Sequence, residues 1–524
     1  LLLLAFVTQA HAQEAHNETA EPVSGRVLGT ISFPTSTRSE EAQAAFIQGV
    51  LLLHLFEYPY AREQFILAQE LDPEFAMAYW GEAMTFNHPI WDEQNLQAGR
   101  NTLMKLGATS ESRLSMTPVA REKGLLAAVE ILYGEGTKAQ RDRSYMRAME
   151  QLAAQFPEDH EIQLFYALSI FGAQAGVRDV PSYMLATALA QAVFSENPNH
   201  PGAAHYLIHG VDDPVHAVLG LQAARALSVM APDAGHSQHM TSHIFVAVGM
   251  WNDVVKANQA AVAVSNEMRT ERGKPARSWG HYNFWLLYGL LQQGQQEQAL
   301  ELLKAAYAQA RDERKAPEDR MILDPDSSLV GSVVQMWARY IIDTDGWNDP
   351  VADWGFTSGD AFDPNLTITF IKTMRTAREG QVAQSGAFLS QFRQLKVELE
   401  SLISRKDEQS PGDLLYLQRL EVLDREMMAA IEMAKGEKGT AIRYAEEASR
   451  LEGEMPFSFG PPFVDLPSAE YLGELLLHAR KNQDAAAAFQ TQLERTRLRV
   501  SALEGLALAF ERAGNIAEAK YARE

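Results

Sequence analysis

Hydrophobic residues recur along this chain at the three- and four-residue spacing of amphipathic helices, from about residue 40 to the C-terminus. The periodic segments run for roughly 12 to 18 residues and are separated by short breaks. No segment shows the strict alternation of hydrophobic and polar residues that marks a half-buried strand. The pattern therefore predicts an all-α protein.

The helical segments also repeat at a fixed period. Glycine, alanine, phenylalanine and proline fall at equivalent positions of a helix-turn-helix unit of about 34 residues near both ends of the chain. Small residues at these positions let paired helices approach closely, and proline ends the second helix. The repeat predicts a tetratricopeptide-like (TPR-like) α-solenoid of stacked antiparallel helix pairs that form a right-handed superhelix. The matching residues are Gly49, Ala61, Phe65, Ala68 and Pro73 in the first unit and Gly473, Ala485 and Phe489 near the C-terminus.

The N-terminus has the pattern of an export signal. Leu1 to Val7 form an apolar run, and Ala10-His11-Ala12 is a small-x-small cleavage site, so we expect cleavage after Ala12 and a periplasmic or secreted protein. The apolar run is far shorter than the roughly 20 residues that span a bilayer. The predicted segments are a signal-peptide remnant (1–12), a flexible leader (13–38), an N-terminal TPR-like array with a histidine-lined groove (39–313), an irregular connector with one helix (314–363) and a C-terminal TPR-like array (364–524).

Composition excludes several kinds of chemistry. The formal net charge is −22 and no basic stripe reverses it locally, which argues against a nucleic-acid partner. The absence of cysteine excludes disulfides, thiolate catalysis and iron–sulfur clusters. No HExxH, GxSxG, P-loop or Rossmann motif is present. Any transition metal must therefore be held by histidine, methionine or carboxylate ligands.

Histidines are concentrated in one part of the chain. Eight of the 14 histidines lie between His200 and His281. Several of them are separated by the repeat period, which places the same side chain at equivalent positions of adjacent helix pairs. The pairs that are 34 residues apart are His205 with His239, His209 with His243, and His54 with His88.

Five segments carry a resemblance to a known family. They read LHLFEYPYAREQF (53–65), DPEFAMAYWGEAMTFNHPIW (72–91), HYLIHGVDDPVHA (205–217), APDAGHSQHMTSHIF (231–245), and GPPF with EYLGELLL (460–477). Together these segments resemble a family of exported bacterial TPR proteins. The resemblance implies the fold and export, and it implies no particular reaction. It also implies that the repeat positions occupied by the clustered histidines face the concave groove.

Helix geometry allows the groove histidines to share a ligand. Residues at i and i+4 of a helix lie about 5–6 Å apart at Cβ, and neighbouring helix axes lie about 8–10 Å apart, a gap that two imidazoles with metal–nitrogen bonds of about 2.0–2.1 Å can bridge. The predicted metal ligands are His205, His209, His236, His239, His243 and His281. Asp212, Asp213, His216, His88 and His54 are expected behind the ligands or at the rim, and Asn87, Tyr288 and Trp80 are expected to line the groove.

Two classes of function fit these observations. In the first, the histidines bind a transition metal such as zinc, copper or iron, and the protein is a metalloenzyme or a metal carrier. In the second, the groove is a scaffold for a peptide or protein, and its histidines are polar lining residues that could also release the partner in acid. An acidic protein with mostly neutral histidines favours a neutral or cationic partner over an anionic peptide.

Overall fold

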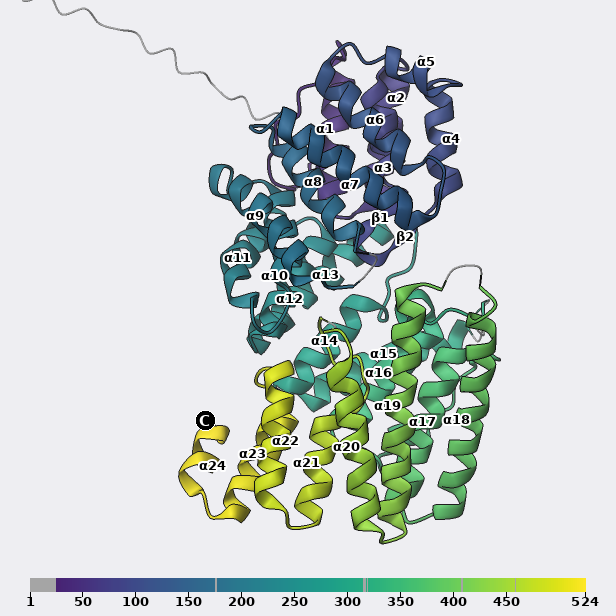
Figure 1. The fold of residues 1–524 in the computed structure, drawn as a ribbon, viewed down its shortest axis with the longest axis vertical. Coiled ribbons are helices and arrows are strands. Elements are labelled where there is room, and N and C mark those ends of the chain that lie inside the picture. Colours follow the sequence, from purple (N-terminus) through teal and green to yellow (C-terminus); the bar gives the residue numbers. More distant parts are fainter. Residues whose placement is uncertain (1–24, 175–176, 314–316, 318, 407–408, 458) are drawn as a thin grey trace, which may run out of the picture.

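The computed structural model describes residues 25–174, 177–313, 317, 319–406, 409–457 and 459–524. Within these residues the chain forms 24 α-helices, and consecutive helices pack against each other along almost its whole length (Figure 1). The arrangement is that of an all-α, TPR-like solenoid, as the sequence predicts. No helix among these residues combines the length and the apolar character that a membrane crossing requires. The predicted signal-peptide remnant, residues 1–12, lies outside the described residues.

The first part of the stack holds helices α1 to α13. In the C-terminal part, helices α14 to α24 lie side by side in the lower half of Figure 1. The first set comprises α1 Glu40–His54, α2 Tyr58–Leu71, α3 Ala76–Met84, α4 Leu96–Leu106, α5 Ser110–Ser115, α6 Ala120–Leu132, α7 Lys138–Gln155, α8 His160–Gly172, α9 Val180–Glu196, α10 Pro201–Val211, α11 Leu221–Met230, α12 Gly235–Ala247 and α13 Trp251–Thr270. The second comprises α14 His281–Gln292, α15 Gln296–Glu313, α16 Leu329–Asp343, α17 Phe362–Arg378, α18 Val382–Ile403, α19 Pro411–Ala434, α20 Lys438–Glu454, α21 Ser468–His478, α22 Asn482–Arg495, α23 Val500–Ala513 and α24 Ile516–Arg523.

The repeat residues make the same contact at both ends of the chain. Phe65 of α2 lies between Gly49 of α1 and Gly81 of α3, so closely that a Cβ at Gly81 would fall 2.3 Å from the ring. Near the C-terminus, Phe489 lies between Gly473 and Gly505, where a Cβ would again fall 2.3 Å from the ring. A large side chain therefore fills a gap between two helices that only glycine leaves open.

Residues 25–38, the described part of the predicted leader 13–38, lie against the helices. Residues 25–38 cross several helices in an extended conformation, and Leu28 and Phe33 are only 2% and 1% exposed. The backbone N–H of Thr30 donates to the carbonyl of Asn199 at 3.0 Å, which ties the segment to the loop before α10. These buried side chains and backbone contacts dock the segment on the helices.

The region predicted as an irregular connector continues the helix stack. It contains α16, close to the single helix expected there, and α16 packs on α14, α15 and α17. The following loop folds back on this helix, since the indole N–H of Trp337 donates to the carbonyl of Val351 at 2.8 Å and Trp347 is buried. Packing therefore does not break at residue 313.

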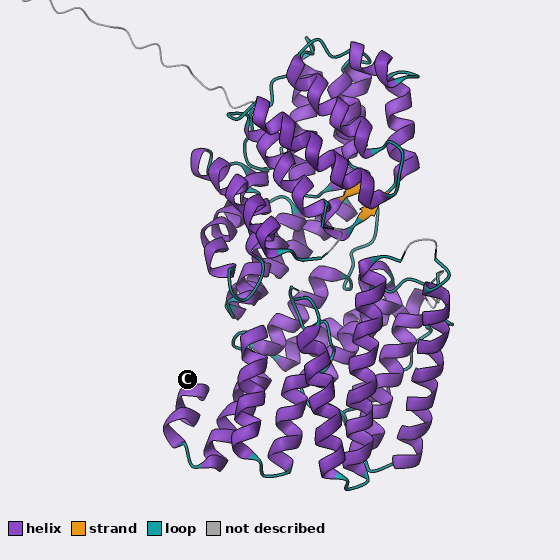
Figure 2. Cartoon of the chain, viewed as in Figure 1, coloured by secondary structure: helices purple, strands orange, loops and turns teal. Residues whose placement is uncertain are grey.

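Short 3-10 helices and one small sheet complete the described structure. The sequence predicted no strand, but Asn87–His88 (β1) and Glu93–Gln94 (β2) pair antiparallel around the 3-10 helix η1 Pro89–Trp91 (Figure 2). Asn87 pairs with Gln94 and His88 pairs with Glu93, so each strand has only two residues. Strands this short show no alternation of hydrophobic and polar residues in the sequence. The other 3-10 helices are η2 Ala217–Gly220, η3 Pro325–Ser327 and η4 Pro350–Asp353.

Candidate metal centre

Helices α10 and α12 carry five of the six predicted ligands, and both are enclosed on all sides. Every residue of α10 and every residue of α12 is buried. Besides its neighbours in the stack, α10 packs against α1, where Gly202 lies so close to His54 that a Cβ would fall 2.4 Å from the ring. The surface that the sequence predicted as an open groove is therefore covered, because the first helix folds across it.

The six histidines form two groups of three. In the first triad (His205, His209 and His236), one ring nitrogen of each residue lies within 4.8 Å of the others. The second triad (His239, His243 and His281) meets the same condition. Within each helix the i, i+4 pair brings two Nε2 atoms together, at 3.1 Å for His205 and His209 and at 3.0 Å for His239 and His243. The two triads adjoin, with 6.2 Å between the ring centroids of His209 and His243.

Four of the histidines are oriented by acceptors at their other ring nitrogen. Each Nδ1–H donates outward, which leaves Nε2 as the ring nitrogen that is available to the centre of its triad. Asn258 of α13 is held with its oxygen toward the site because its Nδ2 donates to the carbonyl of Val254. The donor–acceptor pairs are His205 with the carbonyl of His54 (2.6 Å), His239 with Asn258 Oδ1 (2.8 Å), His243 with Asp212 Oδ2 (2.6 Å) and His281 with Asp326 Oδ2 (2.6 Å).

The Nε2 atoms of His239 and His243 face each other in the second triad at 3.0 Å. Because both residues donate Nδ1–H outward, two lone pairs face each other when both rings are neutral. Two ligands of a tetrahedral ion with metal–nitrogen bonds of 2.0–2.1 Å lie about 3.3 Å apart, so the observed separation is close to that of a chelating pair. Nearby, the Nε2 of His236 and the Oδ1 of Asp212 are buried without a hydrogen-bond partner. These are groups that a cation would satisfy.

Burial favours the neutral form of four of the histidines. Desolvation lowers the pKa of His205 to about 3. Desolvation and the neighbouring imidazoles hold the pKa values of His209, His236 and His239 well below the usual range. At His281 desolvation acts in the same direction, but the Asp326 carboxylate outweighs it and the net pKa is raised. The imidazoles with lowered pKa values therefore carry a free lone pair at neutral pH, as metal binding requires. They are those of His205, His209, His236 and His239.

Aromatic side chains close the site. Phe56 lies over the first triad with its ring centroid 4.4 Å from that of His205, and Trp285 stacks on His243 at 4.4 Å. Phe56 adopts a left-handed backbone conformation (φ 56°), which a bulky residue rarely takes. Two loops fold onto the site, since Trp91 contacts His236 and Phe459 contacts His243.

Asp212, Asp213 and His216 lie in the turn that follows α10. Asp212 lies behind His243, as described above. Asp213 forms an ion pair with Arg178 at 2.6 Å and accepts from the ring of His216 at 2.8 Å. Because the side chain of His216 is 29% exposed, this pair marks the outer edge of the site.

His54 and His88 do not join the main cluster with their rings. His54 contributes its backbone carbonyl to His205, while its imidazole lies in a third, fully buried group with Glu161 (2.7 Å) and His200. The two histidines lower the pKa of Glu161 despite its burial. His88 stacks on Tyr58 and pairs with Glu93 in the small hairpin.

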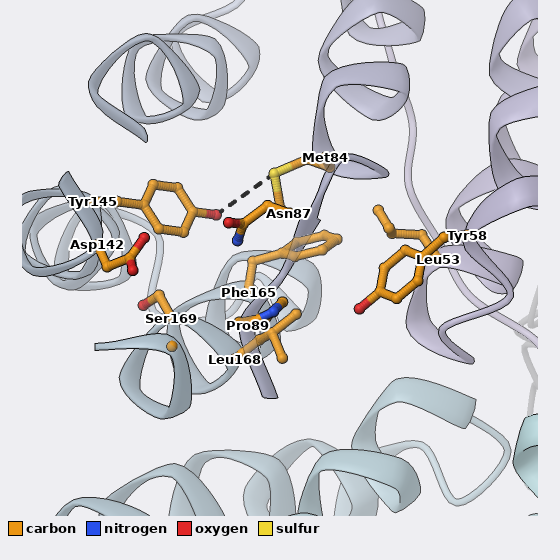
Figure 3. Close-up of a pocket in the computed structure, with 11 residues that line it drawn as sticks. Leu53, Tyr58, Met84, Asn87, Pro89, Asp142, Tyr145, Phe165, Leu168 and Ser169 are labelled. Atoms are coloured by element: carbon orange, nitrogen blue, oxygen red, sulfur yellow. Dashed lines mark hydrogen bonds between the residues drawn. The ribbon is translucent and has the colours of Figure 1, made fainter. Parts of the chain in front are cut away.

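The predicted groove residues are part of the core. Trp80 is 1% exposed and packs on Phe33, and Tyr288 is fully buried against Trp251, because large aromatic rings fill the space between helices. Asn87 lines a small cavity between α1, α3, α7 and α8 (Figure 3). That cavity measures about 10 Å³, the lower limit for a single water molecule, so it cannot hold a substrate.

No protein-family model and no curated protein matches the sequence. Solved structures to which the chain is similar include the human IFIT1 dimer with PPP-AAAA (14% identity, 90% of this chain and 93% of that chain, TM-score 0.36). Others are yeast Tom70 (10%, 93% and 93%, 0.31) and the P58(IPK) TPR domain (11%, 90% and 98%, 0.21). The fold defines the class, a TPR-like helical-repeat protein. Within this fold the chain holds a buried cluster of histidines.

Proposed function

We propose that this protein binds two transition-metal ions, one in each histidine triad. The observation that carries the proposal is the facing Nε2 pair of His239 and His243, whose Nδ1 protons are both committed elsewhere. Two lone pairs at 3.0 Å repel each other unless a proton or a metal ion lies between them, and the pair is spaced to chelate a metal ion. The carboxylate of Asp212 behind this pair supplies compensating charge.

The donor set favours an ion that prefers imidazole. Three imidazole nitrogens suit zinc, copper or iron, and they leave at least one coordination position open. An open position on such an ion can hold an activated water molecule or a substrate atom, so the centre is suited to catalysis as well as to storage. Export to the periplasm, as the sequence pattern suggests, is part of the same proposal.

The scaffold alternative is weaker at this site. Solenoid repeats commonly present extended binding surfaces. Five of the six histidines are at most 8% exposed, however, so a peptide lying along the fold would not touch them. A peptide surface elsewhere on the stack is compatible with the metal proposal, but it does not explain the buried imidazoles.

The test is metal stoichiometry. The full chain is loaded with Zn(II) at neutral pH, freed of excess ion by gel filtration and subjected to elemental analysis. We expect two ions per chain in the wild type and about one in each of the variants His209→Ala and His243→Ala. His478→Ala, which removes an exposed histidine far from the triads in sequence, should keep both ions.

Circular dichroism on the same samples separates loss of a ligand from loss of the fold. Unchanged stoichiometry in both folded variants, or a wild type that retains no ion, refutes the proposal.

A further inference from the structure

Only one ligand of the candidate metal centre reaches solvent. The side chain of His281 is 41% exposed, whereas the other five histidines are at most 8% exposed. His281 and its partner Asp326 line a cavity of about 290 Å³ between the end of α13 and the start of α14. This volume is near the lower end of the range for small-molecule sites. The cavity is therefore the direct route from solvent to the second triad.

The inner end of the cavity is the N-terminus of α14. Gly280, His281, Tyr282 and Asn283 all line it, and they are the N-cap and first three residues of this 12-residue helix. No side chain caps the helix, since the N-cap is glycine. The first-turn N–H groups of a helix lack intrahelical partners, and together with the helix dipole they favour an anion.

A guanidinium group lines the same cavity. Arg269 of α13 donates its Nε–H to the carbonyl of Pro275 at 3.0 Å, which holds the side chain in place. Within the described part of the chain, no carboxylate forms an ion pair with Arg269, although Arg26 and Arg272 nearby are paired with Glu271 and Glu63. Arg269 thus adds positive charge beside the open helix end.

A second polar group points to a hydrogen-bond donor on the ligand. Asn283 is 5% exposed and donates its Nδ2 to the carbonyl of Trp279, so its Oδ1 is the acceptor that faces away from that bond. This Oδ1 is buried without a partner. An acceptor left unpaired inside a protein costs about 1–3 kcal/mol, which a ligand O–H or N–H would recover. Tyr60, Trp279 and Tyr282 supply aromatic walls for the rest of the ligand.

We infer that this cavity is the ligand pocket of the metal centre and that it takes a small organic anion carrying a hydroxyl or amino group beside its anionic group. The anionic group lies between the N-terminus of α14 and Arg269, and it extends toward His281. The neighbouring hydroxyl or amino group donates to Asn283 Oδ1. The inference rests on the proposed function, because the anion is expected to bind more tightly when the second triad holds an ion.

Mandelate is a suitable probe because it combines a carboxylate, an adjacent hydroxyl and a ring. Calorimetric titration of the zinc-loaded full chain with mandelate should show binding. The affinity for mandelate should be at least tenfold lower in Arg269→Ala. The wild type should bind phenylacetate, which lacks the hydroxyl, at least threefold more weakly than mandelate. Metal-free protein should bind mandelate at least tenfold more weakly than loaded protein. Arg450→Ala, which removes an exposed arginine of α20, is the matched control and should bind as the wild type does. Phenyl phosphate in place of mandelate distinguishes a phosphate from a carboxylate site.

Elemental analysis of each sample separates the two proposals. If loaded protein binds neither mandelate nor phenyl phosphate, or binds them equally with and without Arg269, the pocket inference is wrong and the metal proposal stands. Equal affinity in loaded and metal-free protein also overturns the inference, because the pocket would then be independent of the centre. A wild type without metal refutes the proposed function and this inference with it.

Discussion

Replacing Asp212 with asparagine separates the charge behind the second triad from the hydrogen bond it makes. Asp212 is 1% exposed, and its Oδ2 accepts the Nδ1–H of His243 at 2.6 Å. The amide of Asp212→Asn keeps an acceptor for that proton, so the imidazole stays oriented, but the negative charge that strengthens His243 as a ligand is lost. Loss of such a partner typically lowers metal affinity 10- to 100-fold, or about 1.4–2.7 kcal/mol. The short bond and the complete burial favour the upper end of this range.

The affinity is measured by competition between the zinc-loaded chain and a chromophoric chelator at pH 7.5. We expect two zinc-binding steps, one for each triad. The affinity of the second triad should fall in Asp212→Asn, and the affinity of the first triad should keep its wild-type value. Asp213→Asn is the matched control, because the same charge is removed one residue further on, from a carboxylate that pairs with Arg178 and His216. Equal weakening of both steps, or equal effects of the two substitutions, would show that Asp212 does not act through His243.

Two further predictions concern the scaffold. Gly81→Ala should destabilise the protein by about 1–3 kcal/mol, because the new Cβ would lie 2.3 Å from the ring of Phe65, whereas Gly386→Ala in α18 meets no atom within 4 Å and should stabilise by about 0.5–1 kcal/mol. Thermal unfolding measures both, and a stability of Gly81→Ala equal to that of the wild type would contradict the packing argument. Burial raises the pKa of Asp363 to about 7, so its carboxyl binds a proton in the folded state at pH values where the unfolded chain has lost it, and this contribution to stability disappears as pH rises from about 4 to 7. Asp363→Asn keeps an acceptor for the hydroxyl of Tyr416 but has no proton to lose. Its free energy of unfolding relative to that of the wild type should therefore rise by up to roughly 4 kcal/mol between pH 4 and pH 8. A constant difference in melting temperature across this range would exclude the effect.

The repeat architecture could be predicted because it is encoded locally. A phenylalanine that fills the space beside two glycines needs the same residues at the same spacing in each unit, and the positions of Gly49 and Phe65 recur at Gly473 and Phe489. The same logic applies to the histidines. A period of 34 residues brings equivalent positions of adjacent helices together, and His209 and His243 do lie 6.2 Å apart between ring centroids.

What could not be predicted depends on contacts between distant repeats. The expected groove is a buried site because α1 packs on α10, and no local period encodes that closure. Asn258 and Asp326 were missed as partners of His239 and His281, since each is a single polar residue outside the histidine pattern. Phe56 gave no signal either, because its left-handed backbone depends on the turn between α1 and α2 rather than on its side-chain type.

The burial of the histidines links these long-range contacts to the proposed chemistry. Each buried polar atom without a partner costs about 1–3 kcal/mol, and the centre contains at least two, His236 Nε2 and Asp212 Oδ1, besides the facing lone pairs of His239 and His243. Their sum is several kcal/mol, a substantial fraction of the 5–15 kcal/mol that stabilises a typical fold. Bound ions would remove this cost and stabilise the folded state in proportion to their affinity. On the proposed function, metal loading would therefore stabilise the arrangement in which α1 and the two loops cover the site.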